Sequence, residues 1–450
     1  MSTGNPPLAK RRRFTSISVD VFERLMPDAF VLAIALTAIV GAAAAIFSPQ
    51  GTPAAILTGW YAGIFNILGF AFQMVLILVS GHALAHSPPV QAGLRRLVTR
   101  IATPNQAVIT TFLVAAVASW INWGFGLVIG AVLAREVARH IRVDFAWLVA
   151  AAYSGFVIYD SGPSGSIPLS QASPGNALNI VEKITGHILP YSQSIFTILN
   201  IVPTLIVLAI MPFVLIFMRP RADEMQVFVP PPEPPRPARQ AQPSFARRIE
   251  SSPVLSLFLV ACGIAYVIVA YRSGKLIVDA NMVIFLFLIA GLALHGSPLN
   301  FAEAVKNAAK QTGSLILQYP IYGGIMGIMT ATGLAGQISS SIAASASAYS
   351  LPILSFVSSI LISLVIPSGG GHWAVQGPFS IPAAVELNAS VSATTMAVAM
   401  GEQVANMLQP FWALPVVAIA GIGIQRVLGF TVVTFMVSGL IYGAALLILI

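Results

Sequence analysis

Long apolar segments, several of them interrupted by glycine, proline and polar residues, constrain this chain more than any other feature. Apolar residues make up 57% of the 450 residues, and charged residues only 8%. Soluble domains carry roughly 25% charged residues, so the sequence predicts an all-α polytopic membrane protein. The segment 29–47 is long enough to cross a bilayer and follows a polar, basic stretch. We therefore expect an uncleaved first helix there, not a signal peptide.

The interruptions within the apolar segments are expected to mark a binding site. One segment breaks at 160–168, and the stretch 366–415 contains a Gly-rich break followed by a second break that ends in a Gln-Pro dipeptide. An unpaired backbone amide costs several kcal/mol in hydrocarbon, so irregular backbone at membrane depth is tolerated only inside protein or beside a cavity. Because a carboxylate, a histidine and several amides share 366–415, that cavity is predicted to be polar.

The distribution of basic residues predicts the topology. These residues cluster between apolar segments, which indicates positive-inside orientation with a cytoplasmic N-terminus, not a nucleic-acid-binding surface. Stretches 170–190 and 332–350 are expected to be outside loops. Re-entrant hairpins are predicted at 105–139 and 351–387, although two full crossings fit the charges of 105–139 equally well. Nine crossings are expected, at 29–47, 60–86, 146–169, 192–217, 254–271, 280–295, 313–331, 393–423 and 428–449, of which 146–169 and 393–423 are broken helices.

The two halves of the chain share the order and spacing of their breaks. Pro163 and Pro168 precede Pro410 and Pro415 by the same 247 residues, since 410 − 163 and 415 − 168 are equal. The extra helix at 254–271 makes the second copy start on the opposite membrane face, which predicts an inverted-topology repeat typical of secondary transporters. The predicted divisions are a cytoplasmic tail (1–23), a first repeat (24–218), a Pro-rich cytoplasmic linker (219–252), and the extra helix with the second repeat (253–450).

The broken helices supply the candidate substrate-binding residues. The free N–H groups at a helix N-terminus favour an anion, so such ends could hold a small carboxylate where the spans offer no basic side chain. Gly-rich tips are also typical of helix-packing surfaces, and that alternative stays open. The candidates are Asn122, Trp123, Gly124, Gly126, Ser164, Ser166, Ser368, Gly369, Gly370, Gly371, His372 and Gln409.

Four residues are candidates for coupling transport to H⁺ or Na⁺. Glu402 is expected inside a crossing, where a carboxylate must be paired, protonated or bound to a cation. Asn406 lies one helical turn later on the same face. His372 could carry a proton, and Asp160 stands beside the other break. The alternatives are a structural hydrogen-bond network around Glu402, a hairpin-capping role for His372 and a helix-end cap for Asp160.

Catalytic and metal-binding clusters are not evident. Cys262 is the single cysteine and excludes an intrachain disulfide or a cysteine-based metal cluster. Of the six histidines, only His82 and His86 have i, i+4 spacing, and no third ligand is obvious. An intramembrane enzyme is therefore a weak alternative, and no cofactor or metal is expected beyond a coupling ion, with Na⁺ near the helix breaks as one option.

Several longer motifs closely resemble the short-chain fatty acid transporter family, and the match covers most of the chain from Arg24 onward. They are Ile121-Asn122-Trp123-Gly124-Phe125-Gly126-Leu127-Val128, Ala134-Arg135-Glu136-Val137-Ala138-Arg139, Pro367-Ser368-Gly369-Gly370-Gly371-His372-Trp373, Gln376-Gly377-Pro378-Phe379, Gly401-Glu402-Gln403 and Gln409-Pro410-Phe411-Trp412-Ala413-Leu414-Pro415. Asp160 departs from the Gly-rich stretch that the family carries there.

The resemblance implies uptake of small monocarboxylates, such as butyrate or acetoacetate, across a bacterial cytoplasmic (inner) membrane. It also implies kinship with a larger ion-transporter group whose members pair opposed hairpins with broken helices and are often dimers, so a homodimer is expected. A dicarboxylate carrier, a Na⁺/H⁺ antiporter and a channel remain as alternatives. Dicarboxylates would need additional donors or cations, and two opposed broken units suit alternating access better than a steady pore.

Overall fold

The computed structural model describes residues 29–221, 225, 227–228, 245–409, 412–413, 416–417 and 424–450. In these residues the regular structure is entirely helical, which confirms the predicted all-α class. The predicted tail 1–23, most of the linker 219–252 and the end of the second broken segment, including Pro410 and Pro415, lie outside the described residues. The division of the chain into two repeats and a linker therefore stays a prediction.

Six helices of the described part are long and apolar enough to cross a membrane. They confirm a polytopic membrane protein, and two shorter apolar helices accompany them. The total of nine crossings stays a prediction, because the two broken crossings consist of shorter pieces. The six spans are Phe30–Phe47, Pro53–Ala85, Pro104–Ile121, Ile198–Phe217, Arg248–Arg272 and Arg426–Leu449, and the shorter helices are Ala280–His295 and Ser350–Ser363.

Helices make up both halves of the described chain. The first half contains α2 (Ala29–Phe47), α3 (Pro53–Asn66), α4 (Leu68–Ala85), α5 (Pro88–Val98), α6 (Pro104–Ile121), α7 (Trp123–His140), α8 (Phe145–Ser154), η1 (Gly155–Ser161), α9 (Ser166–Ala172), α10 (Ile180–Thr185), η2 (Tyr191–Gln193) and α11 (Ile198–Phe217). The second half contains α12 (Phe245–Glu250), α13 (Pro253–Arg272), α14 (Ala280–His295), α15 (Pro298–Ala309), α16 (Gly313–Ala331), α17 (Leu334–Ser345), α18 (Ser350–Ser363), α19 (Gly369–Glu386), α20 (Val391–Ala405), η3 (Asn406–Leu408) and α22 (Ile424–Leu449).

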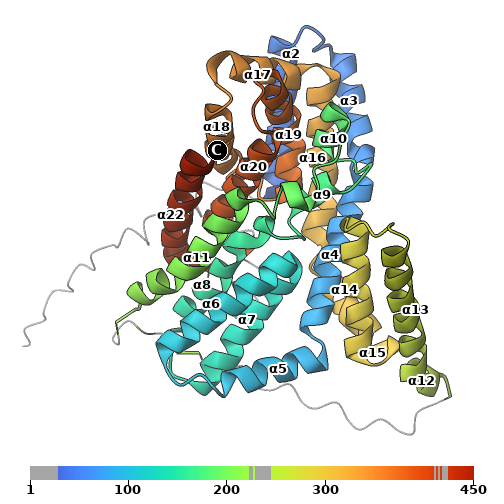
Figure 1. The fold of residues 1–450 in the computed structure, drawn as a ribbon, viewed down its shortest axis with the longest axis vertical. Helices are drawn as coiled ribbons and strands as arrows, with labels where there is room; N and C mark the ends of the chain where they lie inside the picture. The colour runs from blue at the N-terminus through green and yellow to red at the C-terminus, as the bar shows by residue number, and fades with distance from the viewer. Residues whose placement is uncertain are drawn as a thin grey trace, which may run out of the picture.

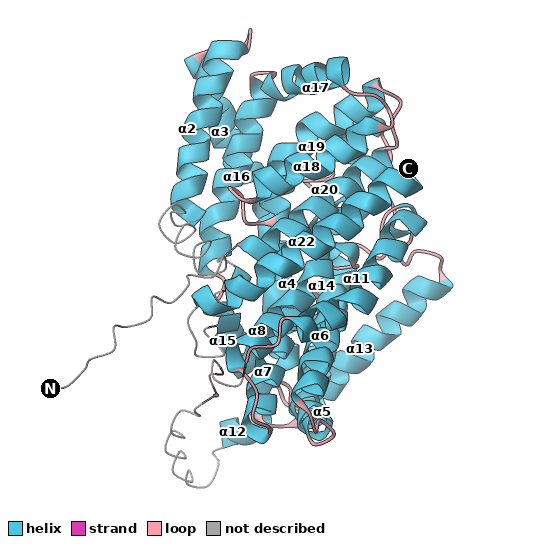
Figure 2. Ribbon diagram, turned by 90° about the vertical axis from the view of Figure 1, so that its left-hand side faces the viewer, coloured by secondary structure: helices cyan, strands magenta, loops and turns pink. Residues whose placement is uncertain are grey.

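Four consecutive helices of the first half recur at one fixed offset. Helices α5, α6, α7 and α8 begin at residues 88, 104, 123 and 145, and α17, α18, α19 and α20 begin at 334, 350, 369 and 391, so each counterpart starts 246 residues later. Figure 1 shows α5 across the lower end of the molecule and α17 across the upper end, as an inverted repeat requires. Figures 1 and 2 show α13 at the edge of the bundle, beside α14.

Glycines bring α3 and α16 into backbone contact. A Cβ built on Gly63 would lie 2.1 Å from the carbonyl oxygen of Gly323, and one built on Gly327 would lie 2.1 Å from that of Gly59. Both pairs are spaced i, i+4, so small residues line both sides of one crossing and allow van der Waals contact between the backbones. This crossing ties the first half of the chain to the second.

Several sequence-based expectations about loops are wrong. The stretch 332–350 is largely helix α17, because its small residues form an apolar face that packs on α19. The break expected at Asn122–Gly126 is confined to Asn122, and helix α7 begins at Trp123. The break expected at Ser368–His372 lies earlier, because Gly369 already starts α19. In both hairpins the glycines lie in the first turn of a helix, where they allow neighbouring segments to approach closely. A polar residue caps each of these helices, so the tip needs no longer irregular segment.

An ion pair joins the starts of two membrane segments from opposite halves. Asp144 is buried, caps α8 through the backbone N–H of Trp147 (2.8 Å), and accepts a hydrogen bond from the Arg426 guanidinium (2.8 Å). We expect Arg426→Gln to lower the free energy of unfolding by about 1–3 kcal/mol, since a buried carboxylate loses one charged hydrogen-bond donor and Arg426 is half-buried. Chemical unfolding in detergent measures this.

The chain contains a matched control for that substitution. Arg139 and Glu136 form a more exposed i, i+3 pair at 2.8 Å. Arg139→Gln should change the free energy of unfolding by less than about 1 kcal/mol. Equal effects of the two substitutions would contradict a structural role for the Asp144–Arg426 pair.

Candidate functional site

Polar caps at both hairpin tips begin the second arm of each hairpin. The Asn122 side-chain oxygen accepts a hydrogen bond from the backbone N–H of Phe125 (2.9 Å), and the Ser368 hydroxyl accepts one from the N–H of Gly371 (3.3 Å). Both cap residues have extended backbone and are fully buried. Each tip therefore directs a helix N-terminus, with its partial positive charge, into the protein interior.

The first broken segment lies between the two tips. Its Ser164 hydroxyl accepts a hydrogen bond from the backbone N–H of Trp123 (3.0 Å), at the start of α7. On the other side, a Cβ built on Gly369 would lie 3.1 Å from Cβ of Ser166 and 2.5 Å from the hydroxyl of Tyr159. The structure thus brings together the N-termini of α7, α9 and α19. The prediction of a binding site at the helix breaks needs these helix ends to lie close together. It also buries Gly124, Gly126, Gly370 and Gly371 around them.

The carboxylate of Glu402 lies at the centre of this region. The Tyr159 hydroxyl donates to one carboxylate oxygen (2.5 Å), and the Asn406 amide donates to the other (3.0 Å). Glu402 is fully buried, and no described basic residue forms an ion pair with it. A buried carboxylate without a counter-charge is costly unless it is protonated or bound to a cation.

Gln403 joins the second broken helix to the first. Its side-chain oxygen accepts hydrogen bonds from the backbone N–H groups of Asp160 and Ser161 (both 3.1 Å), and its amide donates to the Ser161 hydroxyl (2.9 Å). The end of η1 is therefore held by a side chain 242 to 243 residues away in sequence. A movement of one broken helix relative to the other must break these bonds.

Asp160 caps the start of the helix that follows the first break. One carboxylate oxygen accepts from the backbone N–H of Ile167 (3.2 Å), which caps the start of α9. The other oxygen is buried and has no hydrogen-bond partner in the described residues. Asp160 is the chain neighbour of Tyr159, which donates to Glu402, and its own backbone N–H donates to Gln403. The capping interaction is thus observed, and a second buried acid stands near Glu402.

The polar residues after Glu402 reach in different directions. The Gln409 amide donates to the carbonyl and hydroxyl of Ser363, near the tip of the second hairpin. The Tyr153 hydroxyl donates to the backbone carbonyl of Asn406 (2.6 Å) and thereby ties η3 to α8. The side-chain oxygens of Asn406 and Gln409 are buried without a partner in the described part of the chain.

His372 lies within the second hairpin and packs toward α18. Its Nε2 is 2.5 Å from the Gln376 side-chain oxygen and 3.2 Å from the Ser359 hydroxyl. The Ser359 hydroxyl donates to the carbonyl of Val398 (2.7 Å), so both atoms beside Nε2 can accept and the neutral tautomer with hydrogen on Nε2 fits. These contacts tie the second hairpin to α18 and, through Ser359, to α20. The proton-carrying and capping roles of His372 both stay predictions.

Aromatic rings enclose one side of the network. The Trp123 and Trp412 ring centroids are 5.4 Å apart, and Phe156 stacks on Tyr159 at 4.4 Å. Trp123 is buried. Such rings exclude water and so strengthen the electrostatic interactions within the site.

Sequence reasoning missed several residues of this network. Tyr153 and Tyr159 were overlooked, although two tyrosines just before a helix break in an apolar segment are a recognisable signal. Asn200 and Tyr442 gave weaker signals, because each is an isolated position in a long, mainly apolar helix with no adjacent polar residue or break.

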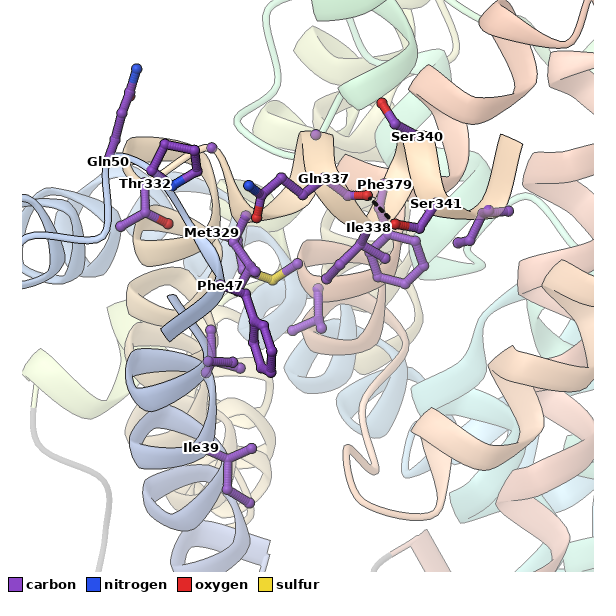
Figure 3. Close-up of a pocket in the computed structure, with 18 of the residues that line it drawn as sticks. Ile39, Phe47, Gln50, Met329, Thr332, Gln337, Ile338, Ser340, Ser341 and Phe379 are labelled. Carbon is purple, nitrogen blue, oxygen red and sulfur yellow. Dashed lines mark hydrogen bonds between the residues drawn. The ribbon is translucent and has the colours of Figure 1, made fainter. Parts of the chain in front are cut away.

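A large open pocket lies apart from this network. Figure 3 shows it between α2, α16, α17 and α19, lined by Phe47, Met329, Gln337, Ile338 and Phe379 among others. Its volume is about 1070 Å³. None of the candidate substrate-binding or coupling residues lines it, so cavity size alone does not identify the site.

Two opposed hairpins and two broken helices that meet at buried carboxylates define the class of helical membrane transporters. Among solved structures, the fold is similar to the YdaH transporter of Alcanivorax borkumensis, with a TM-score of 0.60, 16% identity, and coverage of 93% of this chain and 98% of that one. It is also similar to MtrF of Neisseria gonorrhoeae, with a TM-score of 0.56, 15% identity, and coverage of 96% and 97%.

Sequence comparison identifies the family. The sequence model described as "Short chain fatty acid transporter" matches residues 11–449. The chain is 40% identical over 427 residues to the "Putative short-chain fatty acid transporter" of Escherichia coli (strain K12), covering 93% of this chain and 95% of the relative. A relative of the same name in Haemophilus influenzae is 38% identical over 415 residues, with coverage of 90% and 93%. The chain therefore belongs to the short-chain fatty acid transporter family and is a multi-pass bacterial membrane protein.

Proposed function

We propose that this protein is a secondary active transporter that imports short-chain monocarboxylates, of the size of butyrate or acetoacetate, together with H⁺ or Na⁺. The observation that carries the proposal is the buried pair Glu402 and Asp160 near the N-termini of α7 and α19, without a described basic partner. The N-terminal N–H groups and Ser164, Ser166 and Ser368 can bind the substrate carboxylate. The acidic pair can bind the coupling ion.

Electrostatics provide the coupling between the two bound species. A substrate anion near an ionised acid is repelled, and the repulsion is strong in a water-excluded site. A proton or Na⁺ on the acidic pair removes that repulsion, so each species increases the affinity for the other. His372 is a positioning residue in this proposal because its hydrogen bonds hold the second hairpin. Membership of a transporter family argues against the enzyme alternative.

The proposed membrane arrangement follows the charge distribution of the sequence. The protein is placed in the cytoplasmic membrane with a cytoplasmic N-terminus and inverted repeats that alternate access to the site. A homodimer is proposed on the resemblance to the larger transporter group alone. Cross-linking in native membranes tests the dimer independently of transport.

Uptake of labelled butyrate into proteoliposomes tests the function. With an inward H⁺ or Na⁺ gradient, butyrate should accumulate above its equilibrium level. Removal of whichever of the two gradients drives uptake should stop the accumulation. For proton coupling, uptake should increase as the external pH falls at constant internal pH. Protein-free liposomes provide the control, since undissociated butyric acid crosses lipid unaided. Accumulation of succinate in place of butyrate, or Na⁺/H⁺ exchange without any acid, would support the rival carriers and contradict the proposal.

A further inference from the structure

A groove runs between α13 and α14, and α13 lies at the edge of the helix bundle (Figures 1 and 2). The volume of the groove is about 670 Å³, within the usual range for small-molecule sites. Its walls include the apolar side chains of Leu259 on α13 and of Phe285 and Ile289 on α14. Leu259 is 53% exposed and belongs to a helix of membrane length, so the groove opens toward lipid.

The depth of the groove matches one leaflet of a bilayer. Its lining extends along α14 from Asp279, the N-cap residue, to Ile289, and 289 − 279 is 10 residues. At a rise of about 1.5 Å per residue, this distance is about 15 Å. The hydrocarbon core of a bilayer is about 30 Å thick, so the groove is as deep as one layer of acyl chains.

The turn between the two helices brings a lysine to one end of the groove. Helix α13 ends in a Schellman motif, in which the backbone N–H of Lys275 donates to the carbonyl of Ala270 (2.9 Å) and that of Gly274 donates to the carbonyl of Tyr271 (3.1 Å). Gly274 has the left-handed φ of 68° that this motif requires. An apolar residue frequently follows the glycine and packs on the helix end, but here the residue is Lys275, which lines the groove.

An acidic side chain lies at the same end of the groove. One carboxylate oxygen of Asp279 accepts a hydrogen bond from the backbone N–H of Met282 (2.8 Å) and caps α14. Asp279 is half-buried and, like Lys275, lines the groove. Neither residue forms an ion pair with another described residue. The groove therefore combines apolar walls with one positive and one negative side chain at its polar end.

We propose that this groove binds one phospholipid with a phosphoethanolamine headgroup. The lipid phosphate meets the Lys275 ammonium, the lipid ammonium donates to the Asp279 carboxylate, and one acyl chain lies between α13 and α14. A phosphoglycerol headgroup would satisfy Lys275, but its negative charge would be repelled by Asp279. A phosphocholine headgroup has no N–H to donate. The two charges thus select a zwitterion with a primary ammonium, whichever substrate the protein transports.

The lipid site adjoins a link between α14 and the first half of the chain. Asn281, which also lines the groove, accepts a hydrogen bond from the side-chain amide of Gln73 on α4 (2.9 Å). The side-chain oxygen of Gln73 in turn accepts one from Asn176 (3.0 Å). The bound lipid therefore holds the peripheral helix α13 against the end of α14 that contacts α4.

Cys262 provides a local readout for the test, because it is the single cysteine, is exposed and lines the groove. A bimane fluorophore is attached to Cys262, and the protein is reconstituted into phosphatidylcholine vesicles that contain a small fraction of lipid with brominated acyl chains. Bromine quenches the fluorophore only at close range. Brominated phosphatidylethanolamine should bind roughly fivefold more tightly than brominated phosphatidylglycerol or phosphatidylcholine, as expected for two exposed ion pairs. Native mass spectrometry of the unlabelled protein with each lipid checks that the label does not create this preference.

Three substitutions separate the two headgroup contacts. Asp279→Asn keeps the helix cap, since asparagine caps as well as aspartate, and removes the negative charge. It should weaken binding of phosphatidylethanolamine and strengthen binding of phosphatidylglycerol, so that the preference reverses. Lys275→Gln should weaken both. Arg272→Gln is the matched control, because Arg272 is an exposed basic residue of the same turn but lies outside the groove lining.

Several results would overturn the proposal. Equal quenching by the three brominated lipids would show that the groove does not select a headgroup, and this comparison needs no substitution. A phosphatidylethanolamine preference that survives Asp279→Asn, or that is lost equally with Arg272→Gln, would show that the two lining charges do not read the headgroup. Absence of quenching by every lipid would show that protein, possibly excluded from view in a single chain, covers the groove.

Discussion

Glu402→Gln is expected to lower butyrate uptake roughly tenfold to a hundredfold and to remove its dependence on the driving cation. Hydrogen bonds to a charged group contribute about 1.5–3 kcal/mol each, and the neutral amide weakens those from Tyr159 and Asn406. The amide has nearly the same volume, so packing is preserved. It cannot bind a proton or Na⁺ as a carboxylate does, and the electrostatic link to substrate binding is lost.

Initial rates of butyrate uptake in proteoliposomes, measured across a series of pH values and Na⁺ concentrations, check this expectation. Glu386→Gln is the matched control, because Glu386 is exposed at the end of α19 and should tolerate the change. A Glu402→Gln protein with an unaltered rate and unaltered cation dependence would remove Glu402 from the mechanism. Asp160→Asn in the same assay then shows whether the second acid carries the coupling.

Gly63→Leu is expected to destabilise the protein by about 3 kcal/mol, because its side chain meets the backbone of α16. A Cβ at this position would lie 2.1 Å from the carbonyl oxygen of Gly323 and 2.9 Å from Cα of Gly327. Backbone atoms cannot rotate aside as a flexible side chain can. The two helices must separate, and the contact between the two halves of the chain is lost. The midpoint of thermal unfolding in detergent should fall by about 5 °C or more.

Gly69→Leu serves as the control for steric overlap. A Cβ at Gly69 has no atom within 4 Å, and the residue is exposed. Leucine favours helix formation by roughly 1 kcal/mol over glycine, so this variant should be as stable as the original protein or slightly more stable. Equal unfolding temperatures for the two leucine variants would show that the α3–α16 contact is not as close as the structure indicates.

The positions of the helix breaks could be predicted from the sequence because glycine, proline and polar residues interrupt apolar runs at few places. The break near Asp160 and the break at Gln409 were predicted and are found there. Asn122 and Ser368 were also predicted as tip residues, and both cap a helix. The predicted length of each tip was wrong, because the helices begin at Trp123 and Gly369. Glycines in sequence do not distinguish an irregular loop from a helical turn that needs close packing.

The hydrogen-bond partners could not be predicted, because they join residues far apart in the chain. Nothing local to Tyr159 indicates that its hydroxyl meets Glu402, 243 residues later. Asn200 is likewise a single amide in a mainly apolar helix, and the sequence does not indicate that it donates to two backbone carbonyls. Such contacts depend on how the two halves pack, and packing is not encoded in the spacing of either half.

The amino-acid pattern alone determines that the chain lies in a lipid bilayer and that it is helical. It also determines the constant offset between the halves and the places where the helices stop. Each of these follows from local hydrophobicity and backbone chemistry. The tertiary structure decides which polar groups meet, which acceptors stay unused and which cavities open. The physical reason is that a buried polar atom is satisfied or left unsatisfied only by its neighbours in space. For this protein those neighbours come from the other half of the chain.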